Sequence, residues 1–279
     1  MKRSIVMVAL LAALAPLSAQ QRQAPAPAPR APKIVTDPEA KAALGAAREA
    51  AGQVKGRKGP DRLAALEVAA RAYEEVAERF AGDSAAAARA NFEAAELWRR
   101  HSSLALAERD YLKAADGDPG QFGQRGLLGA ADMQRRQKQL EKALATYGRA
   151  VAAGPAGARA QEARLWRARV MQALGRIDEA IAAFQEALES ASNPRQIIEA
   201  CNWLAKAQIA KGDLDAAARA IRHAEQQVAA APAGDPKEAD RLAKAVASMS
   251  ARRALQRARD KSAKAAKDAV LLEENGGGL

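Results

Sequence analysis

Residues 165–187 read LWRARVMQALGRIDEAIAAFQEA, and the pattern in the second half of this stretch recurs four times in the chain. In each copy a Leu or Ile is followed by Ala after three residues, by Tyr, Phe or Ile after seven, and by Ala after ten. The copies begin 36, 37 and 37 residues apart and are Leu104/Ala107/Tyr111/Ala114, Leu140/Ala143/Tyr147/Ala150, Ile177/Ala180/Phe184/Ala187 and Leu214/Ala217/Ile221/Ala224. A fixed period of this size predicts a helical solenoid.

Each copy is preceded by a second pattern that keeps the same register. Small residues stand twelve positions before the first Ala of each copy, at Ala95, Ala131, Ala168 and Ala205. They predict a first helix that approaches the second closely, with turns at Gly175 and Gly212 between the two. A weaker fifth copy starts at Leu66. Because strong helix formers dominate and period-two alternation is absent, we expect an all-α fold.

These residues resemble the tetratricopeptide repeat (TPR) family, whose unit is a helix pair with a small residue in the first helix and an Ala and an aromatic in the second. The resemblance covers about residues 40–232. The sequence departs from the family in its period, which is longer than the usual 34 residues, and in having Ala where the first helix usually has Gly. The resemblance implies a right-handed α-solenoid with a C-terminal capping helix, and a scaffold that binds a protein or peptide in its concave groove.

Composition shifts divide the chain before and after the repeats. Lys2, Arg3 and the apolar run Ile5 to Ala15 predict a signal peptide over residues 1–19, cleaved near Ala19, and therefore export to the periplasm or secretion. An uncut N-terminal anchor is the alternative. Residues 20–35 are a Pro/Ala-rich linker, 36–234 a repeat domain of about five helix pairs, 235–272 a basic capping helix, and 273–279 a flexible tail.

Enzymatic signals are weak. His101 and His223 are the two histidines, and neither has a companion at a zinc-motif spacing. Cys201 is the one cysteine, which excludes an intramolecular disulfide and suits a buried small residue. We therefore expect no catalytic residues, no metal and no cofactor. Trp166 and Trp203, which recur 37 residues apart, are interpreted as packing residues.

The expected concave face is rich in arginine. Positions of the first helices that packing leaves free predict a partner-binding set: Arg89, Phe92, Arg99, Arg100, Arg125, Leu128, Arg135, Arg136, Arg169, Asn202 and Lys206. Guanidinium forks hold carboxylates in a bidentate way, so a partner with acidic groups is expected. The alternative is that these arginines are solvated or paired with Glu on the same helix.

A second hypothesis rests on charge. The net charge is +11, and cations gather on the last helix at Arg252, Arg253, Arg257, Arg259, Lys261, Lys264 and Lys267. These residues predict contact with a polyanion, which could be an envelope polymer, an anionic lipid surface or nucleic acid. The export signal and an aromatic content of 4% disfavour nucleic acid. The sequence identifies neither the partner nor the oligomeric state.

Overall fold

The computed structural model describes residues 34–230 and 236–276, and this part of the chain is helical without a strand. The helices are α1 (Pro38–Gly52), α2 (Gly59–Arg79), α3 (Ser84–His101), α4 (Leu104–Gly117), the π-helical turn η1 (Pro119–Gly123), α5 (Gln124–Arg136), α6 (Leu140–Ala153), α7 (Gly157–Ala173), α8 (Ile177–Glu189), α9 (Pro194–Lys211), α10 (Leu214–Ala229), α11 (Pro236–Ala247) and α12 (Ser250–Gly276).

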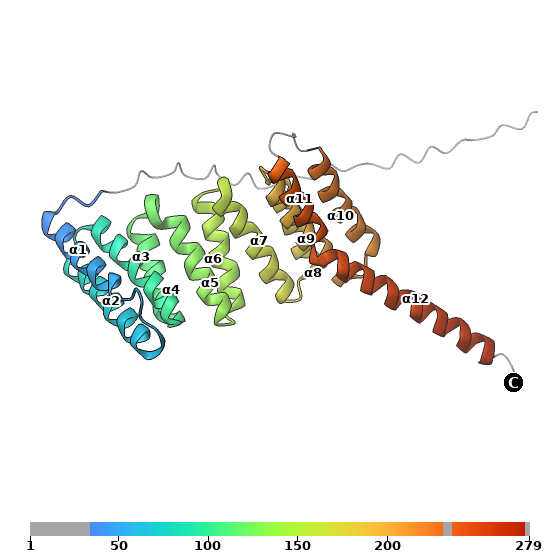
Figure 1. Ribbon diagram of the computed structural model, residues 1–279, viewed down its shortest axis with the longest axis horizontal. Helices are drawn as coiled ribbons and strands as arrows, with labels where there is room; N and C mark the ends of the chain where they lie inside the picture. Colours follow the sequence, from blue (N-terminus) through green and yellow to red (C-terminus); the bar gives the residue numbers. More distant parts are fainter. Residues whose placement is uncertain (1–33, 231–235, 277–279) are drawn as a thin grey trace, which may run out of the picture.

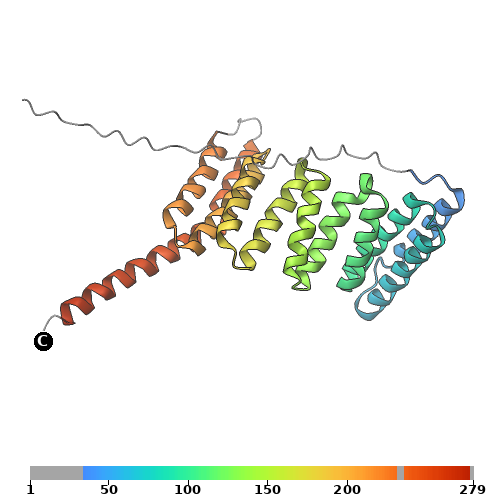
Figure 2. The same cartoon turned by 180° about the vertical axis from the view of Figure 1, so that it is seen from behind.

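The helices from α1 to α10 form five antiparallel pairs that stack side by side into an elongated array (Figure 1; Figure 2). Each helix packs on the one before and the one after it. First helices also contact first helices, α5 with α7 and α7 with α9, so these helices line the inner face of the array. The prediction of an all-α solenoid of helix pairs is confirmed.

Alanines close the contact between the two helices of a pair. The first-helix Ala and its second-helix partner have no exposed surface in any of the four strong units: Ala95 and Ala107, Ala131 and Ala143, Ala168 and Ala180, and Ala205 and Ala217. The aromatic residues of the second helices, Tyr111, Tyr147 and Phe184, are equally buried. The recurring positions are therefore structural, as the sequence predicts.

The turns inside the pairs use one backbone conformation. Gly175 and Gly212 have φ of 78° and 92°, and Ser102 and Lys138 hold the same place in the two preceding units with φ of 72° and 64°. The left-handed region is open to glycine and costs other residues about 1 kcal/mol. Among the four strong units the turn geometry is thus set by the repeat, and glycine relieves its strain in the last two of these units.

The apolar core is divided into three clusters along the array. One spans α1 to α5, a small one runs from α4 to α7, and the third runs from α7 to α12. Leu112 packs against the first two clusters and Leu144 against the last two. The array therefore has continuous packing with two thin places.

The C-terminal region differs from the single helix expected over residues 235–272. The structure has two helices, α11 and α12, that meet at Ser248 and Met249, and α12 continues to Gly276, so residues 273–276 are helical. The backbone N–H of Ala251 donates to Asn202 Oδ1 at 3.0 Å, and Met249 and Leu255 are buried. This contact turns α12 onto α9 and α10, whereas its second half projects beyond the array (Figure 1; Figure 2).

The expected signal peptide, and most of the linker, lie outside the described residues, as do residues 277–279 of the expected tail. The boundaries proposed for them stay predictions.

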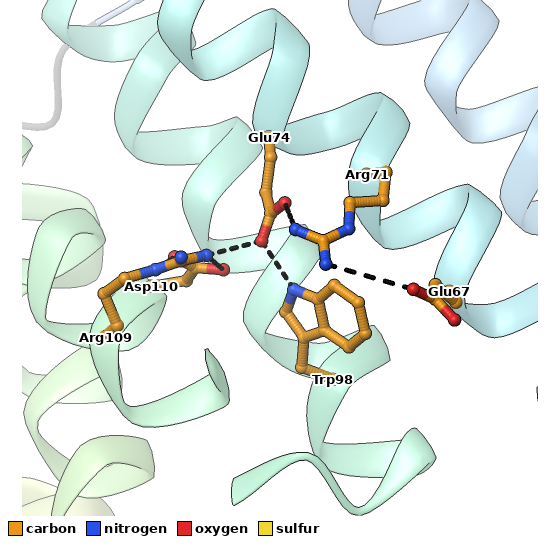
Figure 3. Close-up of polar contacts among 6 residues, drawn as sticks. All are labelled: Glu67, Arg71, Glu74, Trp98, Arg109 and Asp110. Carbon is orange, nitrogen blue, oxygen red and sulfur yellow. Dashed lines mark hydrogen bonds and ion pairs between the residues drawn. The ribbon is translucent and has the colours of Figure 1, made fainter. Parts of the chain in front are cut away.

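A polar network ties α2 to α3 and α4 (Figure 3). Glu74 of α2 accepts hydrogen bonds from Trp98 Nε1 at 2.8 Å, from Arg109 at 2.5 Å and from Arg71 at 3.0 Å. Arg109 also donates to Asp110 at 2.6 Å. Asp110 has no exposed surface, so the network carries charge into the packed interior between three helices.

The pKa values of the two carboxylates in this network shift in opposite directions. Burial alone would raise the pKa of Glu74, but the donors Trp98 and Arg109 outweigh it and hold the pKa below its usual value. Burial raises the pKa of Asp110, and its bond to Arg109 offsets only part of that rise. Glu74 is therefore the member of the network whose ionised form is stabilised by folding.

We expect Glu74→Gln to lower the free energy of unfolding at neutral pH by about 1–3 kcal/mol, because it removes the charge from three hydrogen bonds. A carboxylate with a depressed pKa stabilises the fold above its unfolded pKa and loses that contribution as the pH falls through the folded pKa. The difference in the free energy of unfolding between wild type and variant should therefore shrink below about pH 4.5. Urea unfolding over pH 3–8 measures it.

Glu67→Gln is the control for this prediction. Glu67 lies 3.9 Å from Arg71 and is 52% exposed, so the change should alter stability by less than about 0.5 kcal/mol. A gap between wild type and Glu74→Gln that stays constant with pH would contradict the role assigned to Glu74.

Candidate binding groove on the inner face

Five side chains of the inner face form an alternating row of cations and aromatic rings, which we call the cation–ring stack. Arg135 of α5 lies over the ring of Trp166 of α7 at 4.1 Å. Arg169 lies 3.6 Å from the Trp166 centroid and 3.9 Å from that of Trp203 of α9. Lys206 closes the row, with Nζ 3.9 Å from the Trp203 centroid. Each such contact contributes about 0.5–2 kcal/mol.

The repeat explains why these side chains meet. Trp166 and Trp203 are 37 residues apart, as are Arg169 and Lys206, so they occupy the same places on neighbouring first helices. The indole and the cation of one helix are three residues apart and share a face. Because α7 and α9 are in contact, the cation of α7 lies between both rings.

Two of the cations in the stack lack a counter-ion. Among the described residues, no carboxylate forms an ion pair with Arg169 or Lys206. Burial, followed by the charge of Arg135, lowers the pKa of Arg169, and burial, followed by the charge of Arg169, lowers the pKa of Lys206. The stack therefore holds like charges close together in a partly desolvated place, and an arriving anion would relieve the repulsion.

Two pockets adjoin the stack and share Trp166 and Arg169 as a common wall. The basic pocket, of about 400 Å³, is lined by Arg135, Lys138, Leu140, Trp166, Arg169, Val170, Gln172, Ala173 and Trp203. The acidic pocket, of about 340 Å³, is lined by Ala158, Gln161, Glu162, Leu165, Trp166, Arg169, Gln196 and Glu199. Burial, followed by the nearby charge of Glu199, raises the pKa of Glu162.

Trp166 and Trp203 pack against the core, as the sequence analysis expects. Each is half-buried against an apolar cluster, and the Trp203 ring stacks on Phe184 with centroids 6.5 Å apart. Both indoles also line the basic pocket, which the sequence analysis did not predict. The sequence feature that indicates a place beside the pockets is a cation three residues after each Trp, which recurs with the same period. Recurrence alone indicated packing because core positions recur in the same way.

Three residues of the expected partner-binding set, Arg135, Arg169 and Lys206, lie together in the stack. Arg99 and Arg135 also bond with an acid on their own helix, Arg99 with Glu96 at 2.7 Å and Arg135 with Asp132. The alternative of intrahelical pairing therefore applies to these two arginines.

Phe92 and its neighbours differ from the expectation. Phe92 is only 7% exposed and stacks on Phe122 at 4.9 Å, so it belongs to the core rather than to the groove surface. Arg125 lies over the Phe92 ring at 4.4 Å and covers it from outside. Leu128 is half-buried and packs against the central core cluster. The aromatic character of Phe92 signals a packing role here.

The remaining members of the set are scattered. Asn202 binds the start of α12 through its side chain and is therefore engaged within the fold. Arg100 and Arg136 are exposed. Arg89 lines a separate pocket of about 700 Å³ near the first helix, together with Lys41 and Arg48. The structure thus does not gather the eleven residues into one site.

The cations of α12 are mostly exposed. Arg253, Arg257, Arg259, Lys261, Lys264 and Lys267 have large exposed surfaces. Arg252 is half-buried and pairs with Glu225 of α10, so it is a structural contact rather than part of a free basic surface.

Other chemistry is limited in the part of the chain that is described. Cys201 has no exposed surface, and burial raises the pKa of its thiol to about 11, as expected for a packing residue. Within residues 34–230 and 236–276 no three His, Cys, Asp or Glu side chains gather as a metal site. No helix of this part has the length and apolar character needed to cross a membrane.

One stretch of the repeats resembles a known family. The family model described as tetratricopeptide repeat matches residues 161–194, which cover most of α7, all of α8 and the first residue of α9. No curated protein matches the sequence.

Solved structures share the architecture at low identity. MamA (41-end) from Desulfovibrio magneticus RS-1 is 17% identical with a TM-score of 0.53, over 71% of this chain and 100% of that one. BtubC from P. vanneervenii is 17% identical with a TM-score of 0.51, over 71% and 92%. A putative kinesin light chain of Podosopora anserina with nearly identical TPR-like repeats is 12% identical with a TM-score of 0.53, over 70% and 98%. The likeness concerns the fold.

Beside the stack, one buried hydroxyl lacks a hydrogen-bond partner. In the first strong unit Tyr111 donates its hydroxyl proton to Glu96, fifteen residues earlier. The equivalent pair one unit later is Tyr147 and Asp132, and the Tyr147 hydroxyl has no hydrogen-bond partner among the described residues. Asp is one methylene shorter than Glu, which accounts for the missing bond.

We expect Asp132→Glu to raise the free energy of unfolding by about 1 kcal/mol, because the longer side chain brings an acceptor to the Tyr147 hydroxyl. The reverse exchange, Glu96→Asp, should lower it by about 1–2 kcal/mol, because the bond to Tyr111 is lost. Urea unfolding of both variants measures the effect. Equal and small changes in the two variants would show that the length of the acid is immaterial.

Proposed function

We propose that this chain, a member of the tetratricopeptide repeat family, is a scaffold that binds a segment of a partner protein across α5, α7 and α9. The observation that carries the proposal is the cation–ring stack, which offers two half-buried indoles and two cations without a counter-ion on neighbouring helices. Trp and Arg are the residue types that most often dominate the energy of protein interfaces. The repeat fold is in general a non-catalytic scaffold, and we assign the chain no reaction and no cofactor.

The partner segment is proposed to bring carboxylates to the basic pocket. Arg135, Lys138 and Arg169 line this pocket, and a carboxylate placed there would lie close to three cations. A guanidinium held between two rings is already ordered, so less side-chain entropy is lost when it binds an anion. Burial of the contact would strengthen the attraction relative to water.

The cellular setting of the scaffold is proposed from the sequence. The stretch from Lys2 to Ala19 has the character of a signal peptide, which supports a role outside the cytoplasm in assembling or organising the cell envelope.

A second candidate function is contact with a polyanion through α12. Arg253, Arg257, Lys261 and Lys264 are exposed and follow one another at helical spacing along one side of α12. Cations spaced in this way suit a row of phosphates or other anions.

The groove is tested by purifying partners from an envelope extract with residues 20–279 as bait. We expect the partner bound by wild type to be lost with Arg169→Ala/Lys206→Ala, whose dissociation constant should rise at least ~10-fold because two cations leave the contact. Binding should also weaken as salt screens the charges.

Intact mass of the protein from its own host tests cleavage near Ala19.

Arg149→Ala is the matched control for the groove. Arg149 lies on α6 and pairs with Asp116 at 3.3 Å, and both side chains are more than half exposed. The control should retain every partner. Identical partner yields from wild type and the double variant would overturn the groove proposal.

Polyanion contact is tested with a 20-base-pair DNA duplex as the probe. Changing Arg253, Arg257, Lys261 and Lys264 to Gln should reduce the slope of log affinity against log salt by up to about 3.6, because each lost phosphate contact removes about 0.9. A control variant with Lys113, Lys142, Arg219 and Arg222 changed to Gln removes the same charge from exposed positions elsewhere. Equal losses in the two variants would refute a site on α12.

A further inference from the structure

The two helices at the centre of the stack carry the same three-residue pattern. On α7 it is Glu162, Trp166 and Arg169, and on α9 it is Glu199, Trp203 and Lys206, with every member displaced by 37 residues. In each helix the acid precedes the indole and the cation follows it. The inner face of these helices therefore presents an acidic row, an aromatic row and a basic row in parallel.

The acidic and basic rows do not neutralise each other within a helix. Acid and cation are seven residues apart, which corresponds to about 10 Å along a helix axis at 1.5 Å per residue. No side chain of the described residues forms an ion pair with Glu162 or Glu199, and the cations lie against the rings instead. Both rows thus keep their charge for an external partner.

The preceding units show the opposite arrangement. There Glu96 pairs with Arg99 and Asp132 pairs with Arg135, each three residues along the same helix. Arg125, one unit before Glu162, holds the place that the acid takes in α7. Charge separation is therefore a property of α7 and α9 rather than of the repeat as such.

The rows face two pockets that share a wall. Glu162 and Glu199 line the acidic pocket together with Arg169, whereas the basic pocket contains no acid, and Trp166 and Arg169 form the wall between the two. Burial, followed by the repulsion between the two carboxylates, raises the pKa of Glu162. A bound cation would relieve the repulsion between the two carboxylates. A bound anion would in the same way relieve the repulsion among the cations of the stack.

We propose that the partner segment is bipolar: it places a Lys or Arg side chain in the acidic pocket and an Asp or Glu side chain in the basic pocket, with the residues between them on the indoles. This inference rests on the proposed function and adds the partner's charge pattern to it. In an extended segment a separation of about 10 Å corresponds to three residues. The two opposite charges fix the direction in which the segment runs along the axes of α7 and α9, because reversal would place like charges together.

The inference is tested by selecting a displayed library of random peptides on the full chain. Peptides enriched on wild type should carry a basic and an acidic residue about three positions apart. Selection on Glu162→Gln/Glu199→Gln should lose the basic residue and keep the acidic one. Glu179→Gln/Glu189→Gln, which changes two exposed acids of α8, is the matched control and should enrich the same peptides as wild type.

A titration with one enriched peptide completes the test. Its affinity should fall ~10-fold on Glu162→Gln/Glu199→Gln, and replacing its basic residue by Ala should cause no further loss in that variant. Enriched peptides with acidic residues alone would overturn the bipolar segment and leave the proposed scaffold intact. If wild type enriches nothing beyond Arg169→Ala/Lys206→Ala, the scaffold proposal fails, and this inference fails with it.

Discussion

The burial of one alanine on each helix of a pair is the constraint on which the rest of the structure depends. Ala168 and Ala180 have no exposed surface, and the equivalent alanines of the other strong units are buried in the same way. A larger side chain there would force the helices apart and cost about 1–3 kcal/mol. The buried alanines and the aromatic residues of the second helices supply the packing between helices. The residues of each first helix that face the groove can therefore differ between units.

That freedom is used differently in the two halves of the array. In the first half acids and arginines of the inner face pair on the same helix, and a ring such as Phe92 is drawn into the core. In the second half the cations are held by indoles, which attract a charge without neutralising it. The same backbone thus presents a surface whose charges are paired within a helix in the first half, and a surface with unpaired cations in the second half.

The sequence predicts the fold well because the period is visible in residues that packing requires. Ala131, Gly175 and Phe184 lie where their register indicates. The site is harder to predict because Trp166 and Trp203 recur with the same period as core residues and pack like them, and only their partial exposure shows that they also line a pocket. The break between α11 and α12 has no Pro or Gly to announce it, since it follows from a tertiary contact with Asn202.

The division of the core into clusters bears on the mechanics of the array. The boundary between the last two clusters runs through α7, where Val170 belongs to one and Met171 to the other. The array should bend most easily where the apolar core is interrupted. The cation–ring stack crosses this boundary from Arg135 to Trp203. A molecule bound to the stack would contact helices on both sides of this boundary and would therefore restrict bending between α5 and α9.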